Sequence, residues 1–349
     1  YERMKGKNGG ATVFQTMSTG ITLALTERGM ADGIPILTPA YGLSESADGE
    51  VFKWSFPIGG SHWTSADTQV QYVAQKVGGV DKLKGKKIAL LYHDSPYGKE
   101  AIPVVTARAK KHGFELTAIP VSHPGVDQKA AWLQIRRARP DFVLLWGWGV
   151  MNSTALKEAQ STGFPRDQVV GVWPSGSDSD VKEVAGAAGY SAVLALPGPG
   201  FDSAIAKEVR EKLHAKGQGS GPKEEVGEAL YMRGLMNAMV AVEGVRRAQE
   251  KFGKGQVMTP AQARWGYENL QINDKRLAEL GIADVMQPLA TTCKDHMGPS
   301  AARAYTWNGS KWDVSSEWLH ADPAVLDPMI KAAGDKYASE KKLTRRTAA

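Results

Sequence analysis

The sequence contains a single cysteine, Cys293, among its 349 residues. One thiol excludes an internal disulfide and any CxxC metal or redox motif. No apolar run approaches the roughly 18 residues that a membrane-spanning helix requires. The longest runs, such as 88–92 and 142–146, have the length of buried strands. The chain is too long for one small domain, so we expect two domains of ordinary size.

Motifs for catalysis and for metal or cofactor binding are missing as well. The seven histidines are isolated in the sequence, and no HExxH pattern occurs. The GxSxG elbow and the Walker A loop are absent, and Gly147-Trp148-Gly149 provides only two glycines of a dinucleotide fingerprint. We therefore expect no enzyme activity, no cofactor and no metal. His93 is the histidine of most interest because it follows a predicted strand, although a cap or loop hydrogen bond would account for it.

The charge is mildly basic, with 43 Lys and Arg against 37 Asp and Glu, a net +6. The basic residues are scattered along the chain, whereas a nucleic-acid-binding protein usually concentrates them on one face. We interpret the charge as a surface property and expect no nucleic-acid partner.

Strands alternate with helices of 10–15 residues over the first 200 positions. This alternation predicts parallel sheets built from right-handed crossovers, and hence an α/β fold. The expected strands are 11–15, 34–38, 51–56, 86–92, 114–121, 141–146, 169–172 and 191–196. After position 200 the pattern becomes helical, with a long helix expected over 223–252. Asn308-Gly309 predicts a hairpin between strands 303–307 and 311–319, followed by a helix over 323–339 and a solvated tail over 340–349.

Hydroxyl and aromatic residues follow several of the predicted strands. In open α/β sheets, ligands bind at the carboxyl ends of the strands. Ser18 and Thr19 stand directly before a helix, where two hydroxyls and free N–H groups form a receptor for a carboxylate; simple N-capping is the alternative. Tyr41, Tyr97, Trp148 and Trp173 also stand at strand ends. Each could be ordinary core packing, but four aromatic residues at one edge favour a ligand site.

These segments resemble the periplasmic substrate-binding proteins of ABC transporters, in the branched-chain amino acid (type I, Leu/Ile/Val-binding) family. The resemblance covers nearly the whole chain, and the order and spacing of the motifs carry it. The motifs are Ser18-Thr19-Gly20 before a helix, 33–39 (GIPILTP), 85–98 (GKKIALLYHDSPYG), 140–147 (PDFVLLWG), and the ending from Asp295-His296 to 307–312 (WNGSKW).

The resemblance implies two doubly wound parallel-sheet lobes that are joined by three hinge crossovers and close on a ligand. The amino-terminal lobe would comprise 1–58 and 200–288, the carboxy-terminal lobe 59–199 and 289–322, and 323–349 would form a terminal helix and tail. The chain begins at Tyr1, and the first strands of the family are missing, so we expect a truncated amino-terminal lobe. An export signal for the periplasm would lie in the missing segment.

The resemblance also implies roles for individual residues in an interlobe cleft. Ser18 and Thr19 match the loop that holds the ligand carboxylate, and Tyr41 and Gly42 match a second contact loop of that lobe. Residues of the other lobe match further contacts: Tyr97, Trp148 and Trp173. Tyr231, on the long helix, matches a position that sometimes lines the cleft, although helix core is the alternative.

One departure from the family bears on the ligand. Amino-acid binders of the family carry an acid near 173–175 to pair with the ligand ammonium, and here the first acid is Asp178. An unpaired buried ammonium would be costly, which favours a carboxylate with an aromatic or apolar body. A cation–π contact with Trp148 or Trp173 leaves amino acids open.

The resemblance implies that the protein acts as a monomer and delivers its ligand to an ABC permease in the membrane. Two other functions stay open at this point. One is the ligand-sensing domain of a receptor, and the other is a hydrolase that uses His93 on a similar scaffold.

Overall fold

The computed structural model describes residues 1–347 and divides into two compact units. Unit 1 comprises 1–62, 234–300 and 326–349, and unit 2 comprises 63–233 and 301–325. None of the helices within residues 1–347 is both long enough and apolar enough to cross a membrane. The lobe boundaries expected from the sequence stay a prediction.

Unit 2 is built on a twisted sheet whose strands run in the order β12-β11-β8-β7-β6-β4-β5, with β13 paired to β11. The neighbours from β5 to β8 are parallel, and β11 is antiparallel to β8. The strands are β4 (Lys87–His93), β5 (Glu115–Val121), β6 (Phe142–Trp146), β7 (Val169–Val172), β8 (Ser191–Ala195), β11 (Ala301–Trp307), β12 (Trp312–Val314) and β13 (Leu319–His320). The near-continuous apolar sequence of β6 and β7 fits strands that are buried on both faces.

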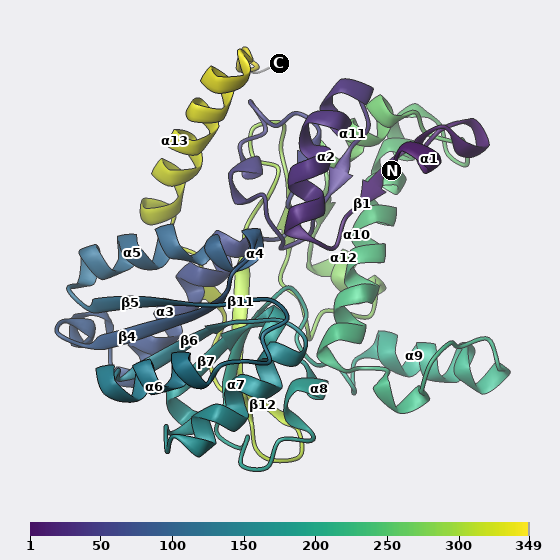
Figure 1. The fold of residues 1–349 in the computed structure, drawn as a ribbon. Coiled ribbons are helices and arrows are strands. Elements are labelled where there is room, and N and C mark those ends of the chain that lie inside the picture. The colour runs from purple at the N-terminus through teal and green to yellow at the C-terminus, as the bar shows by residue number, and fades with distance from the viewer. Residues whose placement is uncertain (348–349) are drawn as a thin grey trace. The chain divides into compact units, whose positions relative to one another are not determined.

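Helices cover both faces of this sheet, with α5 (Ala101–His112) on one side and α6 (Lys129–Ala138) and α7 (Val150–Ser161) on the other (Figure 1). α3 (His62–Val77) is tied to the sheet through the buried Gln69, whose amide donates to the Val170 carbonyl at 2.7 Å and accepts from the Trp146 indole at 2.7 Å. The connections confirm the parallel α/β fold predicted from the strand and helix alternation.

Asn308-Gly309 forms the turn of a hairpin, as predicted, and Trp307 pairs with Trp312 across it. The predicted strand 311–319 is interrupted, however, and only its two ends pair with β11. Between them the Ser316 hydroxyl accepts from the Ala304 amide at 2.9 Å, so a side chain replaces a backbone partner. Because the Ser316 hydroxyl takes the place of a backbone carbonyl, the predicted strand is divided into the two short strands β12 and β13.

Unit 1 contains a small parallel sheet in the order β1-β2-β3 and an antiparallel pair, β9 and β10. The predicted third strand, 51–56, is shorter than expected because Val51 and Phe52 form a turn on the Asp48 carbonyl. The elements that lie in unit 1 are β1 (Phe14–Gln15), β2 (Ile36–Leu37), β3 (Ser55–Phe56), β9 (Gln271–Ile272), β10 (Leu289–Ala290), α1 (Glu2–Lys5), α2 (Thr19–Asp32), α11 (Pro260–Glu268) and α12 (Asp274–Glu279).

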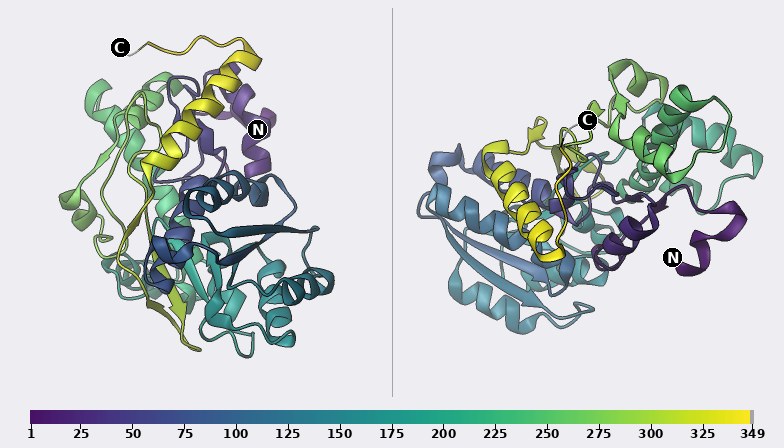
Figure 2. Two further views of the ribbon diagram at one scale, coloured as in Figure 1. Left: turned by 90° about the vertical axis from the view of Figure 1, so that its left-hand side faces the viewer. Right: turned by 90° about the horizontal axis from the view of Figure 1, so that it is seen from above.

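Two long helices contribute residues to both units: α10 (Ala229–Phe252) and α13 (Pro323–Lys341), which can be followed in Figure 2. The remaining helices of unit 2 are α4 (Pro96–Lys99), α8 (Asp178–Val181) and α9 (Ala204–Lys212). Short 3-10 turns lie at Lys7–Gly9, Ser44–Ala47, Val80–Leu83, Arg166–Gln168, Trp173–Ser175, His214–Lys216 and Lys223–Glu225.

The segment after α13 is not the solvated tail predicted for 340–349. Leu343 packs against a small apolar cluster of unit 1 that contains Phe52. Arg345 binds Asp48 at 2.8 Å and Glu50 at 2.9 Å, and Arg346 binds Glu268 at 2.8 Å. The acids that hold these arginines are distant in sequence, so the local sequence does not indicate the docking. Positions 348–349 of the predicted tail lie outside the described residues.

Candidate functional site

The carboxyl edge of the unit 1 sheet carries polar side chains, as the strand order requires. Thr16 follows β1 and Thr38 follows β2, and the ladder continues through both, since their amides donate to Leu37 and Phe56. Both threonines are buried. The Thr16 hydroxyl lies 2.6 Å from that of Thr22, whereas the Thr38 hydroxyl has no hydrogen-bond partner among residues 1–347. This edge therefore offers hydroxyl groups in a buried setting.

Ser18 caps α2, so the capping interpretation holds for its side chain. Its Oγ accepts from the Ile21 amide at 3.4 Å, a long and weak contact, and its carbonyl accepts the Thr22 hydroxyl. The residue is partly exposed. A serine hydroxyl can accept from the helix and donate to an anion at the same time, so capping and ligand binding are compatible.

Thr19 and Tyr41 both contact His62, a residue that the sequence analysis did not select. His62 is fully buried, its Nε2 lies 3.1 Å from the Thr19 hydroxyl, and its ring stands edge-on to Tyr41 with centroids 5.9 Å apart. Gly42 is buried next to Tyr41. Nothing in the local sequence places His62 near position 19; the contact comes from the start of α3 returning to α2.

In unit 2, Tyr97 and Trp148 belong to neighbouring loops at the carboxyl ends of β4 and β6. Tyr97 is buried on α4, where its hydroxyl donates to the Gly147 carbonyl at 3.2 Å. Its ring lies 5.5 Å from that of Trp146. Tyr97 thus holds in place the loop that presents Trp148.

Trp148 is the exposed member of the set, with 47% of its surface accessible. Its ring stacks on His123 at 5.8 Å and lies 5.5 Å from the ring of His93. The Nε2 of His93 is 3.3 Å from the Nδ1 of His123. Burial, and after it the neighbouring His123, hold the pKa of His93 below its ordinary value, while Asp94 acts in the opposite direction. Two imidazole rings therefore support an exposed tryptophan.

Trp173 follows β7 and is covered by an arginine that the sequence analysis missed. The guanidinium carbon of Arg233 lies 3.9 Å from the centroid of the Trp173 ring. Arg233 comes from α10, is 3% exposed, and donates to the Ala195 carbonyl at 3.1 Å. Together with Leu194, Pro197, Ala229 and Leu230, the pair lines a narrow space of about 10 Å³. One face of Trp173 is thus occupied by a buried cation.

The first two acids that follow Trp173 in the sequence, Asp178 and Asp180, accept hydrogen bonds from amide groups of the protein. The carboxylate of Asp178 accepts from the amide of Ala229 at 3.3 Å, and burial, followed by the charge of Glu228, raises its pKa. Asp180 accepts from the Ser177 amide and from the Asn152 side chain, both at 3.1 Å. Burial raises the pKa of Asp180 to about 6. Neither acid is placed as a dedicated partner for a ligand ammonium.

Tyr231 is half-buried on α10. The space beside Trp173 is lined from this helix by Ala229, Leu230 and Arg233, not by Tyr231. Positions 231 and 233 lie about 200° apart around a helix, which separates Tyr231 from the Arg233 contact. Among residues 1–347, no three His, Cys, Asp or Glu side chains come together in a group that could hold a metal ion.

The sequence matches the family described as "Periplasmic binding protein" over residues 1–311, and the chain belongs to this family. Its members are solute-binding proteins rather than enzymes, and those of ABC transporters bind small molecules and work with a membrane permease.

Solved structures agree with this assignment. A protein of the Pseudomonas fluorescens group described as an ABC transporter permease is 42% identical, with a TM-score of 0.93 over 100% of this chain and 85% of that one. A branched-chain amino acid ABC transporter protein of Thermus thermophilus is 20% identical, with a TM-score of 0.71 over 91% and 80%.

A substrate-binding protein of Thermomonospora curvata is 14% identical, with a TM-score of 0.67 over 93% and 79%. The last two share the type I periplasmic binding protein fold and show that fold alone. None of the curated proteins matches this sequence.

Proposed function

We propose that this protein is the solute receptor of an ABC importer and captures a small carboxylate with an aromatic or apolar body. Ser18, Thr19, Tyr41 and Gly42 of unit 1 and Tyr97, Trp148 and Trp173 of unit 2 are the proposed contacts. Tyr231 is a further candidate, supported only by its partial exposure on α10.

The position of Arg233 over Trp173 is the observation that carries the proposed ligand class. An acid and the face of the aromatic ring are the two partners that would compensate the charge of a ligand ammonium at this tryptophan. One face of the ring is taken by the Arg233 guanidinium, and Asp178 and Asp180 accept from amide groups of the protein. A buried cation repels an ammonium and attracts a carboxylate, so the site favours an anion over a zwitterionic amino acid.

The hydroxyl groups of unit 1 suit the carboxylate end of such a ligand. Thr19 shares a hydrogen bond with His62, and when Nε2 donates, the threonine proton is available to an acceptor elsewhere. Ser18 stands at the N-terminus of α2, a helix of 14 residues, whose first N–H groups favour negative charge. The exposed indole of Trp148 offers apolar contact area for the body of the ligand.

The ligands named for similar proteins include both an amino acid and a carboxylate with an apolar body. The Thermus thermophilus structure holds valine, and the Thermomonospora curvata protein is named a fatty acid transporter component. We also propose that the protein works as a monomer in the periplasm and delivers its ligand to a membrane permease. The lobe division predicted from the sequence belongs to the same proposal.

Calorimetric titration of the purified chain with benzoate and with leucine tests the ligand class. We expect saturable binding of benzoate and much weaker binding of leucine. Tight leucine binding without any response to benzoate would overturn the aromatic-acid proposal while leaving the receptor function intact. If native mass spectrometry finds no co-purified small molecule and neither ligand binds, the receptor proposal itself fails.

A matched pair of cap variants tests the role of Ser18. Thr259 also caps a helix of unit 1, accepting from the Gln262 amide at 3.3 Å. Ser18→Ala and Thr259→Ala should each cost about 0.5–2 kcal/mol of stability, because both remove a cap. Only Ser18→Ala should also weaken benzoate binding, and equal affinities in the two variants would remove Ser18 from the site.

A further inference from the structure

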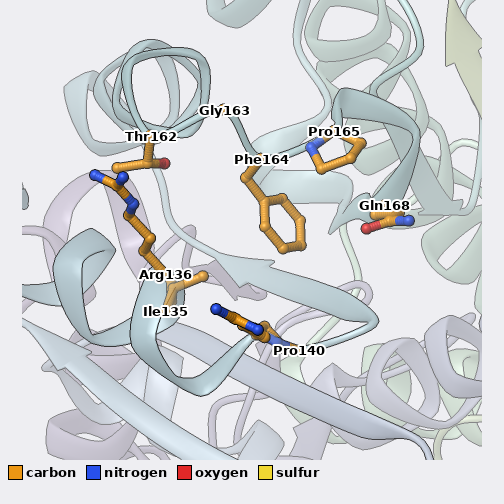
Figure 3. A pocket seen from close by; sticks show the side chains of 9 residues that line it. Ile135, Arg136, Pro140, Thr162, Gly163, Phe164, Pro165 and Gln168 are labelled. Carbon is orange, nitrogen blue, oxygen red and sulfur yellow. The ribbon is translucent and has the colours of Figure 1, made fainter.

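A second pocket opens in unit 2, at the end of the sheet opposite to the proposed solute contacts (Figure 3). It has a volume of about 250 Å³ and lies where β6 and β7 begin, whereas Trp148 and Trp173 follow the carboxyl ends of these strands. Its walls are the last turn of α6, the turn that follows α7, and the segment that leads into β7. The lining residues are Ile135, Arg136, Arg139, Pro140, Thr162, Gly163, Phe164, Pro165 and Gln168.

An aromatic ring forms one wall of the pocket. Phe164 is half-buried, and its ring points into the space above Ile135 and Pro140 (Figure 3). On its inner side the ring is held edge-on against the buried Trp132, with centroids 6.0 Å apart. A partly exposed ring that is fixed from behind offers a rigid apolar surface at little entropic cost.

Two arginines without counter-ions line the same pocket. Among the described residues, neither Arg136 nor Arg139 forms an ion pair or a side-chain hydrogen bond. The nearest acid in sequence, Asp141, is engaged by Lys86 at 3.2 Å and by the Lys87 amide at 2.8 Å. Both arginines are solvent-exposed, so their charges are partly screened by water, and the apolar wall of the pocket has to contribute to binding as well.

We propose that this pocket binds a small organic dianion with a flat apolar body. A guanidinium group can bind a phosphate in bidentate fashion, and two positive charges match the two negative charges of a phosphate monoester. The ring of Phe164 matches an aromatic or otherwise flat body. A volume of about 250 Å³ is slightly below the usual range for ligand sites and suits one ring with one charged group. The site is independent of the proposed solute contacts and would make the receptor a two-ligand protein.

Phenyl phosphate is the probe for this site, with inorganic phosphate and benzyl alcohol as its charged and apolar halves. Calorimetry should show that phenyl phosphate binds more tightly than either half. Saturation-transfer NMR should show contact with the phenyl ring, and the amide signals of Ile135 and Gly163 should shift. The double variant Arg136→Gln/Arg139→Gln should lose at least about tenfold in affinity.

Arg137 provides the matched control, because it lies on the same helix and is exposed but does not line the pocket. Arg137→Gln should leave phenyl phosphate binding unchanged. Phe164→Leu should weaken phenyl phosphate several-fold and leave inorganic phosphate binding unaffected. The proposal is overturned if the wild-type protein does not bind phenyl phosphate, or if Arg137→Gln weakens binding as much as the double variant. Benzoate binding at the solute site should be the same in all these variants, so the two proposals can fail separately.

Discussion

Replacing Arg233 by methionine is the sharpest test of how the solute is recognised. Arg233 is 3% exposed and its guanidinium carbon lies 3.9 Å from the centroid of the Trp173 ring, so its charge acts in a largely water-free setting. A hydrogen bond to a charged group contributes about 1.5–3 kcal/mol. Losing one such interaction with a carboxylate should weaken benzoate binding by about ten- to a hundredfold. Leucine binding should be unchanged or tighter, because the repulsion of its ammonium disappears.

The assay is calorimetric titration of each variant with benzoate and leucine, combined with a thermal melt followed by circular dichroism. Arg233→Met also removes a cation–π contact of about 2 kcal/mol, so the melt should shift downward. Arg233→Lys keeps the charge but loses the planar stack, and should lie between wild type and Arg233→Met. It also provides the readout if the methionine variant does not fold.

Arg210 supplies the matched control in the same unit. Its side chain, like that of Arg233, donates to backbone carbonyls, at 2.7 Å to Val226. It comes from α9 rather than from the neighbourhood of Trp173. Arg210→Gln should lower the melting temperature without changing benzoate affinity. Wild-type benzoate affinity in a folded Arg233→Met protein would refute the role assigned to Arg233.

Three further predictions concern other parts of the molecule. Trp148→Ala should reduce benzoate affinity at least several-fold and shift the melting temperature little, because the side chain is 47% exposed; unchanged affinity would remove Trp148 from the site. Arg108→Met should lower the free energy of unfolding in denaturant by about 3–5 kcal/mol, since it strands the buried Asp67, whose carboxylate is 2.6 Å away. Lys331→Met is the control, because it breaks only an exposed ion pair and should lower the free energy of unfolding by less than about 1 kcal/mol. Equal losses of stability in the Arg108→Met and Lys331→Met variants would contradict the importance of burial. The pKa of Asp180 is raised to about 6, so its contribution to stability is complete in acid and is lost as the pH rises from about 4 through 6. Asp180→Asn should therefore gain stability relative to wild type over this range, and a flat difference between the two unfolding curves would contradict the shift.

The alternation of strands and helices in the sequence predicts much of the fold. The strands 86–92, 141–146 and 169–172 lie within a residue or two of β4, β6 and β7. Their apolar residues are buried on both faces, which is a local property of each segment. The hairpin at Asn308-Gly309 could also be predicted from neighbouring residues alone, because the turn type depends on two adjacent residues. The break in the strand at Ser316 could not be predicted in this way, because it depends on a contact between the Ser316 side chain and Ala304 on another strand.

The candidate site was predictable in part for the same reason. Parallel strands bring their carboxyl ends to one edge, and the order of residues along the chain therefore placed hydroxyls and aromatic rings at the sheet edges. What each side chain meets there is a long-range matter. His62 reaches Thr19 from 43 residues away, and Arg233 covers Trp173 from 60 positions along the chain.

The amino-acid sequence by itself determined the α/β class, the family resemblance and the absence of catalytic motifs in this protein, because these follow from periodicity, spacing and residue type. Only the tertiary structure decided which charge stands beside which ring. The docking of Arg345 and Arg346 on acids of unit 1 and the pocket between Arg136 and Phe164 have the same origin. Electrostatic and packing partners are chosen by distance in space, and folding sets that distance independently of separation along the chain.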